Sequence, residues 1–403
     1  MQDSFGNSVT GTVESAVRSY NAAVDAQLHA WPGVSDACDE AIRADPGFAL
    51  PHALKALALA AYGRTSEARD ALARGIELKP ATAREQSFLE LLAAIFDGKT
   101  LQALALVIEH CRRHPADPLA ASTVVGAYGL FAFSGRADHD AARLDFLESL
   151  APHYPSDFSW LLANRGWARI ECGDVDEGLA MTLRAIAQRP NNAHNAHHVM
   201  HGYYELGRPD EAVAFLGAWL PRYPEAGLMW GHLQWHCALA ELELDQADAA
   251  MQRLLGPILG YLPRGAPFMG LADIASLLWR MGLLGIGPLP WAEAQSHAAS
   301  HFKRGSNPFG EMHLAMLAAA RRDSAALDAA APRLQALTDS GHQGAVAVLH
   351  WARALRALVD GDPAAARNHF DACRRDAVRL GGSHAQRSII ERTQQALSIP
   401  AVG

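Results

Sequence analysis

Small and apolar residues recur along this chain with a long period, and no stretch alternates between apolar and polar residues over the length of a strand. The chain is therefore expected to be helical throughout. The period is marked by prolines at intervals of 34 or 35 residues, with one interval of 40: Pro46, Pro80, Pro115, Pro155, Pro190 and Pro224. A glycine lies seventeen residues before most of them, at Gly63, Gly98, Gly173 and Gly207. A small residue follows each glycine by five positions, at Ala68, Ala103, Gly178 and Ala212.

These three marks have a common physical explanation. A glycine ends the first helix of a repeat in a tight turn, a small residue lets the second helix approach the first closely, and a proline stops the second helix. A period of 34 residues with two antiparallel helices per repeat is typical of tetratricopeptide (TPR) proteins. The predicted fold is all-α, a solenoid of TPR-like helix-turn-helix repeats forming a right-handed superhelix.

The repeats divide the chain into four parts of one continuous solenoid. We expect a helical cap over residues 1–46, TPR-like repeats over 47–263, degenerate helical repeats over 264–345, and a repeat with a capping helix over 346–403. In the last clear repeat before Pro263, Asp245 occupies the position of the turn glycine. Gly361 occupies it in the C-terminal repeat.

Composition narrows the possible partners. The net charge of −8 and the lack of basic clusters argue against nucleic acid. No apolar run is long enough to predict a membrane span, and the first residues lack the pattern of a signal peptide. The five cysteines are scattered without a CxxC motif, so we expect buried free thiols and a cytoplasmic protein. A monomer and a homodimer both remain open.

Histidines gather in one repeat. His194, His197, His198 and His201 fall at positions that line the concave surface in TPR superhelices, and Glu205 follows them on the same helix. In the next repeat, His232 and His236 take the same kind of position beside Trp235. The sequence thus predicts six imidazoles on one stretch of the inner wall of the groove.

The chemistry of this cluster has three alternatives. His197/His201 and His232/His236 are spaced i,i+4, which suits chelation of one divalent metal ion such as zinc, manganese or iron. The same four histidines are also candidates for metal-free acid–base catalysis. The third alternative is a group of partly solvated groove histidines that bind no metal. The HExxH motif is absent, and Glu205 is the nearest candidate base.

Polar residues near the C-terminus form a second group of candidates. Residues 381–387 read GGSHAQR, and Ser383 with Gln386 predicts a capping box at a helix start. Capping does not explain Arg387, so we expect it to bind an anionic ligand. His313, and the pair His297/His301, lie where the repeat frame does not fix their orientation.

Several of these residues together resemble the tetratricopeptide repeat protein 38 family of divergent TPR proteins. The resemblance rests on Pro51-His-Ala53, Arg84-Glu-Gln86, His197-x-x-x-His201, His232-x-x-Trp-His236, His313 before an apolar run, and Gly381-Gly-Ser-His-Ala-Gln-Arg387. It implies that His197, His201, His232, His236, His313, Gln386 and Arg387 are family features. It implies no particular reaction. His194, His198 and Glu205 are not clearly part of the family pattern.

Two functions follow as expectations. The first is a pocket in which these histidines, Trp235, Glu205, His313, Gln386 and Arg387 bind a small polar or anionic ligand, with metal- or histidine-dependent catalysis as an extension. The alternative is an interaction scaffold that holds a peptide or partner helix in the concave groove. The concentration of unusual side chains favours the pocket, and TPR repeats in general favour the scaffold.

Overall fold

The computed structural model describes residues 1–303, 305–339 and 341–397. This part of the chain is helical, and its only β contact is an isolated bridge between Gln2 and Ser8. The chain forms two compact units. Unit 1 comprises residues 1–131, 140–206 and 215–230, and unit 2 comprises residues 132–139, 207–214 and 231–403.

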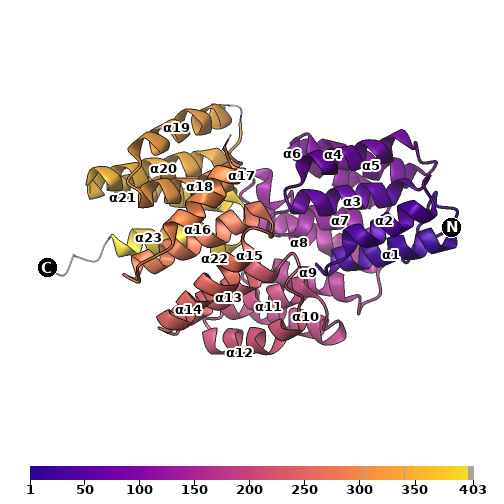
Figure 1. Cartoon of the computed structure of the whole chain (residues 1–403), viewed down its shortest axis with the longest axis horizontal. Coiled ribbons are helices and arrows are strands. Elements are labelled where there is room, and N and C mark those ends of the chain that lie inside the picture. The colour runs from indigo at the N-terminus through magenta and orange to yellow at the C-terminus, as the bar shows by residue number, and fades with distance from the viewer. Residues whose placement is uncertain (304, 340, 398–403) are drawn as a thin grey trace. The chain divides into compact units, whose positions relative to one another are not determined.

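Most helices of unit 1 pack as pairs of sequence neighbours, as predicted (Figure 1). They are α1 (Glu14–Leu28), α2 (Val34–Ala44), α3 (Ala49–Ala61), α4 (Thr65–Glu77), α5 (Ala83–Phe96), α6 (Thr100–Arg113), α7 (Pro118–Val125), α8 (His139–Leu150), α9 (Ser159–Glu171), α10 (Val175–Gln188) and α11 (Ala193–Glu205). Helix α8 begins at the last residue of the segment 132–139, and α12 (Pro209–Trp219) contributes residues to both units.

Unit 2 continues with helices up to the C-terminal part of the chain. They are α13 (Trp230–Glu243), α14 (Ala247–Arg253), α15 (Leu259–Tyr261), α16 (Pro267–Leu283), α17 (Trp291–His301), α18 (Pro308–Ala320), α19 (Ser324–Asp339), α20 (Gly344–Asp360), α21 (Pro363–Arg375), α22 (His384–Arg387) and α23 (Ile389–Ala396). A π-helical segment, Leu254–Ile258, joins α14 to α15 around Pro257.

The predicted turns are confirmed. Gly63, Gly98, Gly173 and Gly207 all have positive φ angles, between 61° and 93°, which glycine adopts without steric cost. Asp245 occupies the same turn position with a φ of 56°. Aspartate is among the few other residues that visit this region, so the irregular repeat keeps the same turn geometry.

The predicted close approach of paired helices is clearest between α9 and α10. A methyl group added to Gly178 would lie 2.5 Å from the carbonyl oxygen of Gly166, and one added to Gly166 would lie 2.7 Å from that of Gly178. Two glycines facing each other therefore allow direct backbone contact. This explains why the repeat carries small residues at both positions.

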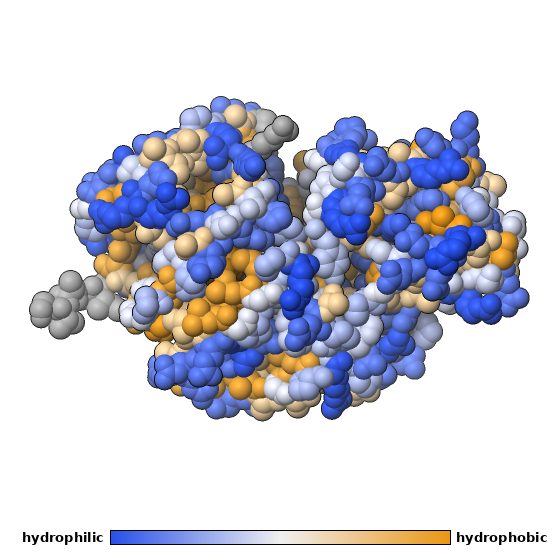
Figure 2. Space-filling model, viewed as in Figure 1, coloured by the Kyte–Doolittle hydropathy of each residue, from blue (hydrophilic) through white to orange (hydrophobic). Residues whose placement is uncertain are grey.

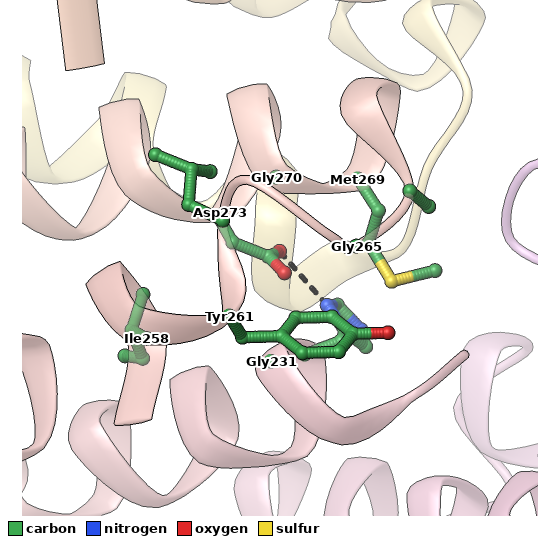
Figure 3. A pocket seen from close by; sticks show the side chains of 10 residues that line it. Gly231, Ile258, Tyr261, Gly265, Met269, Gly270 and Asp273 are labelled. Atoms are coloured by element: carbon green, nitrogen blue, oxygen red, sulfur yellow. Dashed lines mark hydrogen bonds and ion pairs between the residues drawn. The ribbon is translucent and has the colours of Figure 1, made fainter. Parts of the chain in front are cut away.

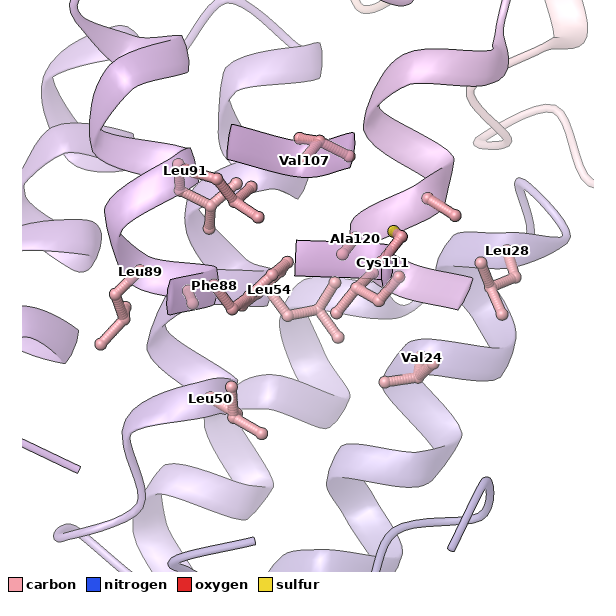
Figure 4. Close-up of a cluster of buried hydrophobic side chains, with 14 of the residues drawn as sticks. Val24, Leu28, Leu50, Leu54, Phe88, Leu89, Leu91, Val107, Cys111 and Ala120 are labelled. Carbon is pink, nitrogen blue, oxygen red and sulfur yellow. The ribbon is translucent and has the colours of Figure 1, made fainter. Parts of the chain in front are cut away.

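The core of unit 1 fills the space between successive helix pairs. Figure 4 shows its apolar side chains, contributed by α1, α3, α5, α6 and α7. Leu50, Leu54 and Phe88 are almost fully buried there. On the face visible in Figure 2 the surface is mostly hydrophilic, with smaller apolar areas between the polar ones.

Unit 1 also joins segments that are far apart in the sequence. The hydroxyl of Tyr223 donates a 2.6 Å hydrogen bond to the carbonyl oxygen of Ala30. The backbone N–H of Ala193 donates a 3.0 Å hydrogen bond to the carbonyl oxygen of His29. Arg189 pairs with Asp25. The first helix pair therefore packs against residues around 190 and 223, in addition to its neighbour in sequence.

The cysteines follow the prediction in part. Cys38, Cys111, Cys237 and Cys373 are buried free thiols, whereas Cys172, in the turn after α9, is exposed. Among the described helices, none combines the length and the hydropathy that crossing a membrane would require.

Candidate functional site

Helix α11 carries four of the predicted histidines. It begins after Asn192, whose side chain accepts a 3.0 Å hydrogen bond from the backbone N–H of Asn195 and so caps the first turn. It ends before the Gly207 turn. Nearly all of this helix is buried, because α9 and α10 pack against it, so the alternative of partly solvated groove histidines is wrong for this helix.

His197 and His201 lie one turn apart on α11 and their side chains meet. Their Nε2 atoms are 3.0 Å apart, and their rings are perpendicular. The exposed fractions are 5% for His197 and 1% for His201. Glu171, the last residue of α9, places Oε1 3.3 Å from Nδ1 of His201, and its side chain is fully buried. Unit 1 thus holds an imidazole pair with a buried carboxylate beside one of its rings.

The other α11 residues have different surroundings. His198 stacks on Trp167 of α9, with ring centroids 5.2 Å apart, and the guanidinium of Arg143 lies 4.0 Å from the centroid of the Trp167 ring. Burial lowers the pKa of His198 well below its ordinary value, and it lowers the pKa of His194 to about 4. Both imidazoles are therefore neutral at pH 7. Glu205 is half-buried at the end of the helix.

Helix α13 in unit 2 carries the second predicted pair. His232 Nδ1 lies 2.8 Å from Oδ1 of Asp273 on α16, and the His232 ring stacks on Trp235. The rings of His232 and His236 are 4.8 Å apart. Trp235 donates from Nε1 to the hydroxyl of Ser276. Burial raises the pKa of Asp273, and the attraction of His232 offsets part of that rise.

A small pocket lies beside the His232–Asp273 pair. Its cavity volume is about 20 Å³, and it is lined mainly by apolar atoms of α15, α16 and the turn between them, including Tyr261 and Met269. Figure 3 shows the Asp273 carboxylate directed across this pocket toward His232, with the Tyr261 ring in front. This volume is room for about one water molecule and lies far below the range for ligand sites.

The C-terminal candidates are buried in unit 2. The predicted capping box is confirmed, because Ser383 and Gln386 exchange side chain-to-backbone hydrogen bonds at the start of α22. The guanidinium of Arg387 donates to the carbonyl oxygens of Gly381 and Gly382, at 3.2 and 2.6 Å. These bonds hold the double-glycine turn in place. Anion binding by Arg387 stays a prediction.

His313 on α18 is also buried. Its Nδ1 donates a 2.8 Å bond to the carbonyl oxygen of Phe309, and burial lowers its pKa to about 4. Its Nε2 has no hydrogen-bond partner among the described residues. His297 and His301 have rings 4.8 Å apart, and His297 Nε2 donates to the carbonyl oxygen of Pro267.

Sequence reasoning missed the carboxylates that lie beside the histidines. Glu171 stands just before the Gly173 turn, where an acidic residue gives no signal of its own. Asp273 stands in the apolar run Leu271-Ala-Asp-Ile-Ala275, and a lone aspartate in such a run is a usable signal, because a buried carboxylate needs a partner.

No known protein-family profile matches the chain. Among solved structures it is similar to a tetratricopeptide repeat protein from Parabacteroides merdae ATCC 43184, with 14% identity over 78% of this chain and 99% of that one, and a TM-score of 0.40. It is also similar to yeast Tom70, with 12% identity over 94% of this chain and 87% of that one, and a TM-score of 0.38. At these scores the similarities carry no functional argument. The TPR-like, all-α fold rests on the helix pairs and glycine turns described above.

Proposed function

We propose that this chain is a TPR-like interaction scaffold, and that unit 1 binds an extended segment of a partner protein. A groove in unit 1 supports this proposal. It lies between the α1–α2 turn, the C-terminal end of α3 and residues 226–228, and it is a solvent-open groove with a cavity volume of about 260 Å³. Trp31, Tyr62 and Leu228 line it and are only half-buried.

The lining indicates the chemistry of the partner. Most of the groove is formed by aromatic, alanine and other apolar side chains, which suit an apolar anchor of a peptide. Asp36, in the first turn of α2, is exposed at its edge, and the chain as a whole carries a net charge of −8. We therefore expect the bound segment to combine an apolar anchor with a lysine or arginine close to it.

The test is selection from a randomised displayed-peptide library on the immobilised full chain. Peptides that enrich are synthesised, and their affinities are measured by fluorescence anisotropy. Ala61→Trp fills the groove from the end of α3 and is expected to weaken binding by at least about tenfold, roughly the effect of losing one buried anchor. Asp36→Lys is expected to weaken only peptides that carry a basic residue.

Ala73→Trp is the matched control, because Ala73 is exposed on α4 and does not line the groove. It should leave the affinities unchanged. The proposal fails if no peptide enriches, or if the selected peptides bind the Ala61→Trp and Ala73→Trp variants equally well.

A second function is favoured by one observation, the buried His232–Asp273 pair. A carboxylate that holds Nδ1 of a histidine fixes its tautomer and orientation, which suits binding or acid–base chemistry on a small polar ligand. The resemblance to the tetratricopeptide repeat protein 38 family includes His232 and stays a prediction. Asp273→Asn tests this function, because ligands trapped by the native protein should be lost from the variant.

A further inference from the structure

The imidazole pair of α11 points to a metal site that is independent of the peptide groove. We propose that His197 and His201 chelate a single divalent transition-metal ion through their Nε2 atoms. Both side chains leave the same face of α11, one turn apart, and their Nε2 atoms already converge to 3.0 Å. Both are buried, so they have little of the rotational freedom that surface histidines lose on chelation.

The spacing of the two nitrogen atoms fits this chemistry. A tetrahedral zinc ion with Zn–N bonds of about 2.0–2.1 Å holds two ligand nitrogens about 3.3 Å apart. The pair therefore needs to open by only a few tenths of an ångström. At 3.0 Å one of the two nitrogens carries the hydrogen that the other accepts. When the ion binds, the ring that carried this proton on Nε2 takes the tautomer that carries it on Nδ1, by exchange with solvent, so both imidazoles stay neutral and each Nε2 donates its lone pair.

Glu171 supplies the outer contact that metal-bound histidines usually have. Its Oε1 lies 3.3 Å from Nδ1 of His201, and its negative charge favours the tautomer that carries the proton on Nδ1 and presents the Nε2 lone pair to the ion. Its negative charge also compensates part of the charge of the ion. The nearby guanidinium of Arg143 opposes a cation, but Asp140 pairs with it at 2.5 Å. The charges around the site therefore suit a cation that is bound by two neutral imidazoles with one carboxylate nearby.

The donor atoms select the class of metal. Two imidazole nitrogens suit zinc, cobalt, nickel or copper, whereas calcium, magnesium and manganese prefer oxygen ligands. Of the metals that the sequence predicts, zinc fits these donors better than manganese. Water or another donor completes the coordination.

Cobalt(II) is the probe for the test, because its visible absorption reports the ligand set. The untagged full chain is stripped with a chelator and titrated with cobalt, and zinc is then added in competition. We expect the visible absorption to saturate at one cobalt ion per chain and to disappear when zinc is added. His197→Gln should weaken binding at least 100-fold, and Glu171→Gln should weaken it about 10- to 100-fold, the usual effect of losing an outer carboxylate.

His153→Gln is the control, because His153 is an exposed histidine of the same unit that lies outside the proposed site. Its loss should leave cobalt binding unchanged. Circular dichroism of each variant reports folding, and Glu171→Gln, which has the same shape as the native residue, carries the test if His197→Gln does not fold. The proposal is overturned if the native chain shows no saturable band, or if the band persists in both Glu171→Gln and His197→Gln.

Discussion

His313 shows what burial does to a single imidazole in this protein. Its pKa is lowered to about 4 by burial, whereas in the unfolded chain the ordinary value is about 6.5. Between these pH values the unfolded chain takes up a proton that the folded chain does not. Stability should therefore fall as the pH drops below about 6.5, by up to roughly 3 kcal/mol near pH 4.

Urea unfolding at pH 7, 6 and 5 measures this dependence. His313→Gln should flatten the fall by up to about 1.4 kcal/mol per pH unit, the contribution of one proton. The exposed His153→Gln should leave the slope unchanged. Equal slopes in the native chain and His313→Gln would mean that folding does not shift the pKa of His313. The slope is the readout, because losing the bond to Phe309 lowers stability at every pH.

At the residue scale, the sequence predicts which histidines pair but not what orients them. The i,i+4 spacing of His197 and His201 is enough to predict their contact, since it depends on one helix alone. Glu171 comes from another helix, and its approach depends on how α9 and α11 pack. The burial of the cluster was not predictable for a related reason. Trp167 and Arg143 are large side chains that cover the face assigned to an open groove.

At the scale of elements, the contact between α9 and α10 gives a direct prediction. Gly178→Ala places a methyl group 2.5 Å from the carbonyl oxygen of Gly166, so the helices must separate. We expect a loss of about 1–3 kcal/mol in the free energy of unfolding, the usual cost of overpacking. Chemical denaturation followed by circular dichroism measures it.

Gly217→Ala is the matched control for this effect. Gly217 lies in α12, and an added methyl group would meet no atom within 4 Å. Alanine there should stabilise the protein by about 0.5–1 kcal/mol, because it favours the helix over the unfolded chain. If both substitutions stabilise the protein, the α9–α10 contact is looser than described.

The turns were predictable at this scale because each depends on a few neighbouring residues. Gly173 and Asp245 satisfy the same left-handed backbone conformation, and the sequence frame places both. The packing of α13 on α16 was not predictable, because it brings His232 to Asp273 across 41 residues. Neighbouring residues determine the turns of the repeat, whereas the shapes of side chains determine which helices pack together over longer separations in sequence.

At the scale of the whole molecule, unit 1 departs from a simple solenoid, in which each repeat contacts only its neighbours. The bonds from Tyr223 to Ala30 and from Ala193 to His29 join its first helix pair to distant segments. The groove proposed to bind a peptide lies at this junction. Its shape therefore depends on contacts that the repeat period alone does not predict.

Tyr223→Phe tests the junction, because the buried hydroxyl donates to Ala30 and accepts a 3.1 Å bond from the backbone N–H of Met229. Its loss leaves both groups unsatisfied and should cost about 1–3 kcal/mol. Hydrogen exchange should speed up at the amides of Met229 and Ala193, and in the turn between α1 and α2. Tyr62→Phe, which removes a solvent-exposed bond to Ala226, should change little. Faster exchange at Met229 alone would show that the distant segments hold together without this hydroxyl.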